Sequence, residues 1–214
     1  MQIKPSDLKP REFYRILISS VAPRPIAWVS TLSKDGIANL APFSFFNALC
    51  GTPPLLGFCP GIRAREIREA LGSPVKDTLQ NIRDTGEFVV AVVTYEVAGR
   101  MNLTAGDYEA SVDEFKLAGV TPRVSQIVKP AQVAESPVNF ECKVYQILDF
   151  GTETSGGSMV IGEIVAANLA ESILKDGRVD GNLIDLVGRM GGNQYSRTTV
   201  RFEMERPGLK PSQK

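Results

Sequence analysis

RPIAWVSTLSKDGIANLAPFSFFN, residues 24–47, contains two strand-like runs joined by an Asp-Gly turn. In the first run, residues 26–32, side chains alternate between two faces, as they do in a β-strand. Ile26, Trp28, Ser30 and Leu32 share one face, and Ala27, Val29 and Thr31 share the other. The turn at residues 33–36 favours a tight hairpin, so we expect residues 39–47 to run back beside the first strand.

Other periodic segments predict a chain that is mainly β with short helices in its connections. We expect strands at residues 55–59, 88–93 and 198–203. Residues 140–150 and 159–169 should form a long hairpin, joined by a loop of Gly, Ser and Thr at 151–158. We also expect a surface insertion at 62–71 and short helices at 96–103 and 112–117. A clearer helix spans residues 78–85 and ends at Gly86. Its N-cap is Asp77 with Gln80 as a capping box, or alternatively Ser73 with Pro74 at the first helical position.

Residues 140–150 show the strongest alternation in the chain. Phe140, Cys142, Val144 and Leu148 share one face, whereas Glu141, Lys143 and Asp149 share the other. This pattern is typical of an antiparallel strand with one face in solvent. Strands outnumber helices and no G-x-G-x-x-G motif follows a strand, which favours a closed antiparallel barrel over a doubly wound sheet. We expect one domain over residues 1–205, with 1–20 as a lead-in and 206–214 as a polar tail.

Composition narrows the possible functions. The 24 basic and 24 acidic residues cancel without long runs of like charge, so we expect a small-molecule or protein partner, and neither nucleic acid nor a membrane surface. No spanning segment or signal peptide is evident, and we interpret the protein as cytoplasmic. Three cysteines without a close pair suit reduced, packed thiols. The absence of histidine excludes His-dependent nucleophiles, bases and metal sites, so an enzyme of this sequence would rely on a cofactor.

Hydroxyl and aromatic side chains around the first hairpin are candidates for ligand binding. Ser30, Thr31 and Ser44 could converge at one sheet edge and hold the polar tail of a ligand, and Phe45 and Phe46 offer flat surfaces to an aromatic ring. The alternative is a barrel core with satisfied hydroxyls. Trp28 likewise suits either a core or a cofactor platform.

Three further segments could bind an anion or a flat ligand. Lys76-Asp77-Thr78 begins a helix, where backbone N–H groups and a lysine attract phosphate, although an ordinary capped helix looks the same. Arg63, Arg65 and Arg68 could approach an anionic tail or form a solvated face. The glycine-rich segment 189–197, with Arg189, Asn193 and Tyr195, could approach a ligand or simply turn into the last strand.

Together these motifs resemble the flavin reductase-like family of split-barrel FMN-binding proteins. The resemblance rests on residues 24–31, 39–46, Pro53-Pro54, Lys76-Asp77-Thr78 with Asn81-Ile82, and residues 191–195, and it covers roughly residues 20 to 200. It implies a six-stranded antiparallel split β-barrel and a homodimer that binds FMN non-covalently, or FAD, near the subunit interface. The residues that it implies for the cofactor are Trp28, Ser30, Thr31, Ser44, Phe45, Phe46 and Cys59, with Lys76 and Thr78 at the phosphate, and those for the substrate are Arg189, Asn193 and Tyr195.

The resemblance implies an NAD(P)H-dependent flavin reductase that supplies reduced flavin or electrons to an oxygenase or another redox partner. Many members carry a histidine in the late hairpin near the nicotinamide, but residues 159–165 contain none. That departure keeps open a flavoredoxin-like electron carrier without direct nicotinamide oxidation. The Arg-rich segment between Pro60 and Pro74 is also longer than the family pattern implies. A third alternative is an empty barrel that acts in protein assembly.

Overall fold

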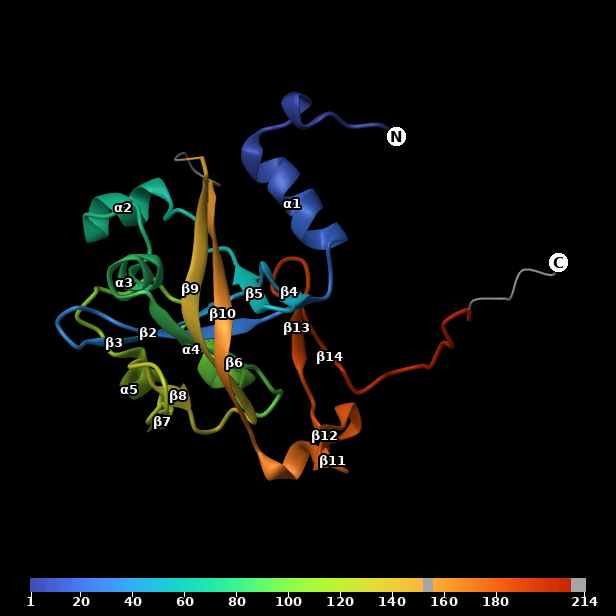
Figure 1. The fold of residues 1–214 in the computed structure, drawn as a ribbon. Helices are drawn as coiled ribbons and strands as arrows, with labels where there is room; N and C mark the ends of the chain where they lie inside the picture. Colours follow the sequence, from blue (N-terminus) through green and yellow to red (C-terminus); the bar gives the residue numbers. More distant parts are fainter. Residues whose placement is uncertain (152–155, 209–214) are drawn as a thin grey trace.

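The computed structural model describes residues 1–151 and 156–208 (Figure 1). The helices are α1 (Pro10–Ser20), α2 (Arg65–Leu71), α3 (Asp77–Thr85), α4 (Ala98–Leu103) and α5 (Glu114–Ala118), with 3-10 turns at Pro5–Asp7, Glu171–Ile173 and Gly181–Leu183. The strands are β1 (Arg24–Pro25), β2 (Ala27–Leu32), β3 (Ala38–Phe43), β4 (Phe46–Gly51), β5 (Pro54–Phe58), β6 (Glu87–Val92), β7 (Pro122–Arg123), β8 (Gln132–Val133), β9 (Val138–Phe150), β10 (Gly157–Leu169), β11 (Leu174–Lys175), β12 (Arg178–Val179), β13 (Val187–Arg189) and β14 (Tyr195–Arg197). In the part of the chain that the structure describes, no helix is long and apolar enough to span a bilayer.

The largest sheet has seven antiparallel strands in the order β3-β2-β6-β9-β10-β5-β4. The expectation of a mainly β chain with helices in the connections is therefore confirmed. The expected count of six strands is not, and among the described residues the outer strands β3 and β4 do not pair with each other to close the sheet. A three-stranded sheet, β1-β13-β14, lies beside it and brings the late glycine-rich segment next to residue 24.

The hairpin of β2 and β3 forms as its sequence predicts. Trp28 pairs with Pro42 and Ser30 with Leu40, and Gly36 closes the turn with a φ of 81°. The predicted return strand, 39–47, is nevertheless two strands. The chain bends after Phe43, and β4 then pairs with β5. The bend therefore places β3 and β4, which are neighbours in sequence, at opposite edges of the sheet.

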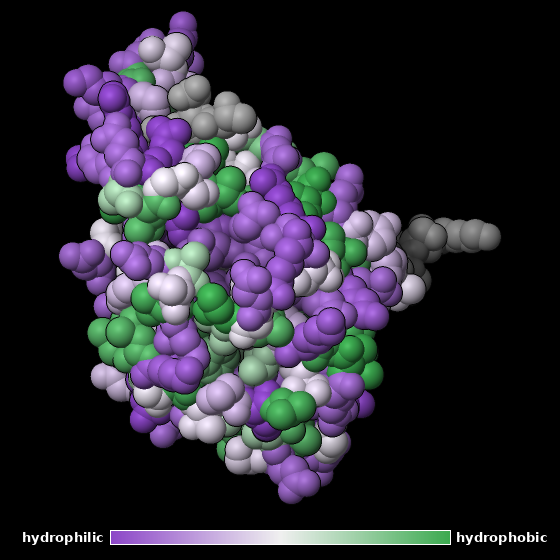
Figure 2. Space-filling model, turned by 90° about the vertical axis from the view of Figure 1, so that its left-hand side faces the viewer, coloured by the Kyte–Doolittle hydropathy of each residue, from purple (hydrophilic) through white to green (hydrophobic). Residues whose placement is uncertain are grey.

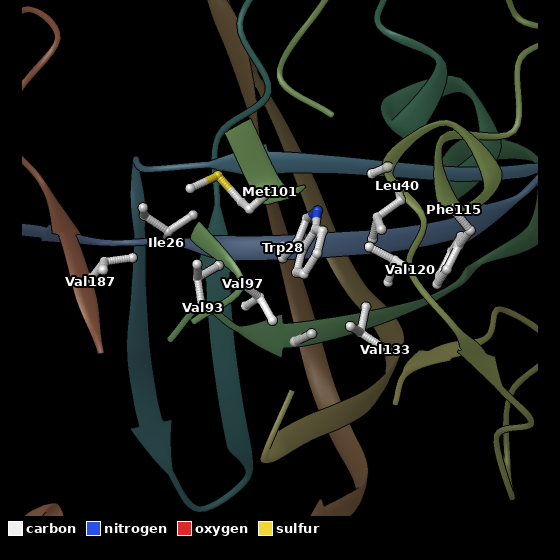
Figure 3. Close-up of a cluster of buried hydrophobic side chains, with 12 residues drawn as sticks. Ile26, Trp28, Leu40, Val93, Val97, Met101, Phe115, Val120, Val133 and Val187 are labelled. Carbon is white, nitrogen blue, oxygen red and sulfur yellow. The ribbon is translucent and has the colours of Figure 1, made fainter. Parts of the chain in front are cut away.

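The two faces of β2 are both buried and pack against different clusters, which confirms the predicted alternation. On one face Ile26 and Trp28 join the cluster drawn in Figure 3, which also contains Leu40 and Met101. Trp28 is fully buried, and its Nε1 donates a hydrogen bond of 2.9 Å to Thr104 Oγ1. The remaining members of this cluster are Ala91, Val93, Val97, Phe115, Ala118, Val120, Val133 and Val187. The opposite face packs against a second cluster that includes three ring-to-ring neighbours, Phe43, Phe58 and Phe88.

The helix α3 begins one residue away from its predicted cap. Lys76 occupies the N-cap position, and the Asp77 carboxylate accepts a hydrogen bond of 2.5 Å from Arg63 instead of capping the helix. The predicted capping box and the alternative start at Ser73 are both wrong. The predicted end is confirmed, because Gly86 has a left-handed φ of 73°.

The long hairpin forms from β9 and β10, but its predicted faces need two corrections. A bulge between the pairs Ile161–Gln146 and Gly162–Val144 shifts the alternation, so that Ile147 packs against the core and Leu148 is exposed. Glu141, predicted on a solvated face, is fully buried beneath the connecting segment that contains residues 126–128. Residues 152–155 of the predicted loop lie outside the described residues.

The structure does not contain the predicted last strand at residues 198–203. The described residues after β14 form neither helix nor strand. The last pairing is β13 with β14, in which Gly188 lies opposite Ser196. Of the predicted polar tail, residues 206–208 are described without regular structure and residues 209–214 lie outside the description.

Candidate functional site

A cavity of about 480 Å³ opens between α1, the bend after β3, the end of β5 and the β9–β10 hairpin. Its lining residues are Arg11, Tyr14, Pro42, Phe43, Ser44, Phe45, Cys59, Pro60, Gly61, Ile62, Ala64, Phe150, Gly156 and Gly157. The volume lies within the range of small-molecule sites, and an apolar wall with a few polar groups is typical of them. Of the residues that the sequence singled out, Ser44, Phe45 and Cys59 line this cavity.

Arg24 organises the bend that forms one wall. Its side chain is 6% exposed, and its guanidinium donates hydrogen bonds of 2.6 Å to both Ile18 O and Val21 O at the end of α1. It also donates to Met190 O in the late loop and to Ser44 Oγ in the bend. Burial lowers the pKa of Arg24. One buried cation thus connects three segments that are distant in sequence, a role that the Arg-Pro dipeptide alone did not reveal.

Aromatic rings from three segments surround the mouth of the cavity. The rings of Tyr14 on α1 and Phe45 lie 6.2 Å apart at 39°, and the Arg24 guanidinium lies 5.7 Å from the Phe45 ring centre. Phe150, at the end of β9, is more than half exposed although it lines the cavity. Sequence reasoning missed Tyr14 and Phe150, because neither belongs to a motif and only the fold brings them together. Such rings can enclose a flat aromatic ligand.

The floor of the cavity forms where β5 ends and β10 begins. The backbone N–H of Cys59 donates to Phe45 O at 2.8 Å, and its thiol lies 3.7 Å from Met159 Sδ. Burial raises the pKa of the Cys59 thiol, which keeps this group neutral near pH 7. A Cβ atom on Gly157 would lie 2.8 Å from Pro60 O, so only glycine permits this approach of the two strands.

The hydroxyls of Ser30 and Thr31 do not converge with that of Ser44. Neighbouring residues of β2 point to opposite faces, and both side chains are 1% exposed. Thr31 Oγ1 donates to Asn39 Oδ1 at 3.2 Å and accepts from Asn81 Nδ2 at 3.0 Å. Ser30 Oγ has no partner among the described residues. These two residues and Trp28 therefore belong to the packed interior and not to the cavity wall.

Thr78 belongs to the same buried network. Its hydroxyl donates a hydrogen bond of 2.7 Å to Asn39 Oδ1, and the residue is 1% exposed. This geometry leaves the hydroxyl turned toward the sheet instead of toward the first turn of α3.

We expect Thr78→Val to lower the free energy of unfolding by about 1–2 kcal/mol, because the substitution removes a buried hydrogen bond. If the chain binds FMN as the family resemblance implies, its affinity for FMN should change less than about twofold, since the hydroxyl is already committed to Asn39. Urea denaturation and flavin titration of the same preparation measure both quantities. A large loss of FMN affinity at unchanged stability would instead place Thr78 at the ligand.

The cations near α3 are already paired with carboxylates. Lys76 Nζ lies 3.2 Å from Asp107 Oδ1, and the buried Arg63 side chain donates to Val75 O and Asp77. Arg63 therefore contacts and stabilises the start of α3, whereas the exposed Arg65 forms an ion pair with Glu69 on its own helix. The cation that lines the cavity itself is Arg11. The space-filling view of the side on which α2 and α3 lie is largely hydrophilic, with hydrophobic side chains in separate groups (Figure 2).

The late glycine-rich loop, residues 189–197, contacts Arg24 beside the bend after β3. Its predicted site residues Arg189, Asn193 and Tyr195 do not line the cavity. Arg189 donates to the hydroxyl of Tyr195 and to Gly192 O, and its guanidinium lies 4.5 Å from the Tyr195 ring centre. Asn193 is exposed. Contact with the bend runs through Met190 O, which accepts from Arg24.

Comparisons with known proteins agree with this architecture. The family described as the flavin reductase like domain matches residues 19–187. The solved 2-nitrobenzoate 2-nitroreductase of Pseudomonas fluorescens is 33% identical, with a TM-score of 0.85 over 100% of both chains. Component B of the nitrilotriacetate monooxygenase from Bacillus cereus is 29% identical, with a TM-score of 0.87 over 95% of this chain and 98% of that one. A Shewanella frigidimarina protein described as having a split barrel domain is 23% identical, with a TM-score of 0.78 over 97% of this chain and 100% of that one, and supports the fold alone.

Proposed function

Since the chain belongs to the flavin reductase-like family, we propose that it binds FMN in the cavity beside α1 and acts as an NAD(P)H:flavin reductase. The observation that carries the proposal is the cavity itself, whose aromatic and apolar wall suits a flat ring and whose rim carries a cation for an anionic tail. Ser44, Phe45 and Cys59 line it, whereas Phe46, the first residue of β4, lines two neighbouring cavities instead. FAD is the alternative flavin.

The residues present fit a flavin by their chemistry. Phe45 and Tyr14 offer ring faces that exclude water, Ser44 offers a hydroxyl, and Arg11 offers a positive charge. Lys76 could join the anionic end if it exchanged its contact with Asp107 for phosphate. Bound FMN would supply hydride acceptance from a nicotinamide and onward transfer of electrons. The chain needs only to bind and orient both molecules, because hydride transfer to a flavin requires no side-chain base.

The proposal extends to partners. The nitrilotriacetate monooxygenase component of Bacillus cereus supports supply of reduced flavin to an oxygenase, and the nitroreductase of Pseudomonas fluorescens supports an oxidoreductase activity. We assign residues 1–205 to one domain and the active protein to a homodimer. Exposed apolar side chains on α1, at its C-cap and on β4, namely Ile16, Leu17, Val21 and Leu49, are consistent with a covered surface. Arg189, Asn193 and Tyr195 are assigned to the substrate side of the site.

Visible spectroscopy tests this proposal. Protein reconstituted with FMN should absorb in the visible range, and anaerobic mixing with NADH or NADPH should bleach the flavin within seconds. The same protein with free flavin removed by gel filtration is the control. A protein that stays colourless and does not bind added FMN contradicts both the cofactor and the reaction.

A flavoredoxin-like electron carrier is the second candidate. The absence of histidine from β10 favours it, because the family resemblance implies a histidine near the nicotinamide in this hairpin. A flavin that is reduced by dithionite but remains oxidised with both nicotinamides would identify a carrier.

A further inference from the structure

The C-terminal arm, residues 198–205, begins with a turn and a bend at residues 198–200 and then leaves the body of the protein as neither helix nor strand (Figure 1). Val200, Phe202 and Met204 are 92%, 85% and 80% exposed. Alternate residues of a β-strand lie on the same side, so these three large side chains would form one apolar face if the arm became a strand. Their sequence is that of a β-strand, yet the arm pairs with no strand among the described residues.

The opposite side of the arm carries charges of both signs. Arg201 donates hydrogen bonds of 3.0 Å to Asn182 Oδ1 and to Ile184 O, which are neutral acceptors. Within residues 1–151 and 156–208, neither Arg201 nor Glu203 forms an ion pair. The arm therefore holds an unpaired cation and an unpaired anion two residues apart.

The sequence Val200-Arg201-Phe202-Glu203-Met204 is complementary to itself in the antiparallel direction. If two copies pair about Phe202, each Arg201 faces the Glu203 of the other copy, and each Val200 faces a Met204. Opposite charges and apolar pairs across antiparallel strands stabilise a sheet, whereas like charges destabilise it. The charged pairs and the apolar pairs thus both indicate the same partner, a second copy of this chain.

We propose that the C-terminal arm forms an antiparallel two-stranded ribbon with the arm of a second copy, centred on Phe202. A ribbon of two strands is marginal in water unless its apolar face is covered. A cavity of about 470 Å³ at the root of the arm provides that cover, with mainly apolar walls that include Pro23, Phe46 and Leu186. Because Phe46 follows the bend at Ser44 and Phe45, the ribbon places a second copy beside the wall of the candidate site. This association does not depend on flavin.

Charge reversal tests the pairing by sedimentation of the full chain. Arg201→Glu and Glu203→Arg each replace the two ion pairs of the ribbon with two pairs of like charge. Each variant should therefore weaken self-association by about tenfold or more. The double variant, and an equal mixture of the two single variants, should both recover the affinity of the unaltered protein. Glu205→Arg is the matched control, because residue 205 faces Thr199 and should change little. Failure of the mixture to recover association overturns the ribbon, as does a monomeric unaltered protein.

Disulfide formation tests the centre of the pairing even if other surfaces also hold the dimer. Opposed residues in antiparallel strands have Cα atoms about 4.5–5.5 Å apart, within reach of a disulfide. With the exposed Cys50 changed to serine, Phe202→Cys should form a covalent dimer on mild oxidation. Val200→Cys should not, because the two copies of residue 200 would lie about 13 Å apart along the strands. Equal cross-linking at both positions, or none at residue 202, contradicts the proposal.

Discussion

Ala64→Trp should raise the dissociation constant for FMN at least about 100-fold, a loss of about 2.7 kcal/mol in binding free energy. Ala64 lines the cavity from the start of α2, so an indole ring at this position fills space that the flavin would occupy. Small-molecule sites bury most of their ligand, and a blocked wall removes both apolar contact and the polar contacts beyond it. Flavin fluorescence quenching measures the affinity, and circular dichroism checks that the fold persists.

Ala70→Trp is the matched control, because residue 70 lies on the same helix but is exposed and outside the cavity. Its affinity for FMN should stay within about twofold of the unaltered protein. If Ala64→Trp bound FMN as well as Ala70→Trp, the flavin would have to bind elsewhere. One alternative is the neighbouring cavity that shares Ser44 and Phe45 with the candidate site.

Local sequence patterns predicted the elements whose geometry is local. The alternation of residues 26–32, the Asp-Gly turn and the glycine after α3 all describe neighbours along the chain, and the structure contains each of them. The bend after Phe43 was not predictable in this way, because it depends on β4 finding β5 at the far edge of the sheet. Likewise the bulge near Tyr145 depends on the register between β9 and β10.

The candidate site was predictable only in part for the same reason. Ser44 and Phe45 lie in a conspicuous motif, whereas Arg11, Tyr14 and Phe150 come from a predicted lead-in and from a hairpin end. Thr31 looked like a group for the polar tail of a ligand and Thr78 like a phosphate group, but packing turns both hydroxyls toward Asn39. Residue type alone does not reveal which way a side chain points from a strand or from a first helical turn.

Glu141 shows most clearly how tertiary structure changes the meaning of a local pattern. On β9 it alternates with apolar residues as a solvent-facing side chain would, yet it is 0% exposed. Its carboxylate accepts hydrogen bonds from the backbone N–H groups of Gln126, Ile127 and Val128 and from the side-chain amides of Gln132 and Asn168. Burial by itself would raise the pKa of Glu141, but the backbone hydrogen bonds outweigh it and the pKa lies below its ordinary value. The anion therefore holds the connecting segment onto the sheet.

Glu141→Leu should accordingly lower the free energy of unfolding by about 3–5 kcal/mol, because it leaves several buried N–H groups without an acceptor. Glu163→Leu, an exposed glutamate on the adjacent strand β10, is the control and should stay within about 0.5 kcal/mol of the unaltered protein. The sign of the pH dependence follows from the lowered pKa. The stabilisation is fully present above the unfolded pKa of about 4.3 and is lost as pH falls through the lower folded value. Urea denaturation from pH 7 to pH 3 should therefore show a steeper loss of stability for the unaltered protein than for Glu141→Gln, and parallel curves would contradict an ionised Glu141 in the folded state.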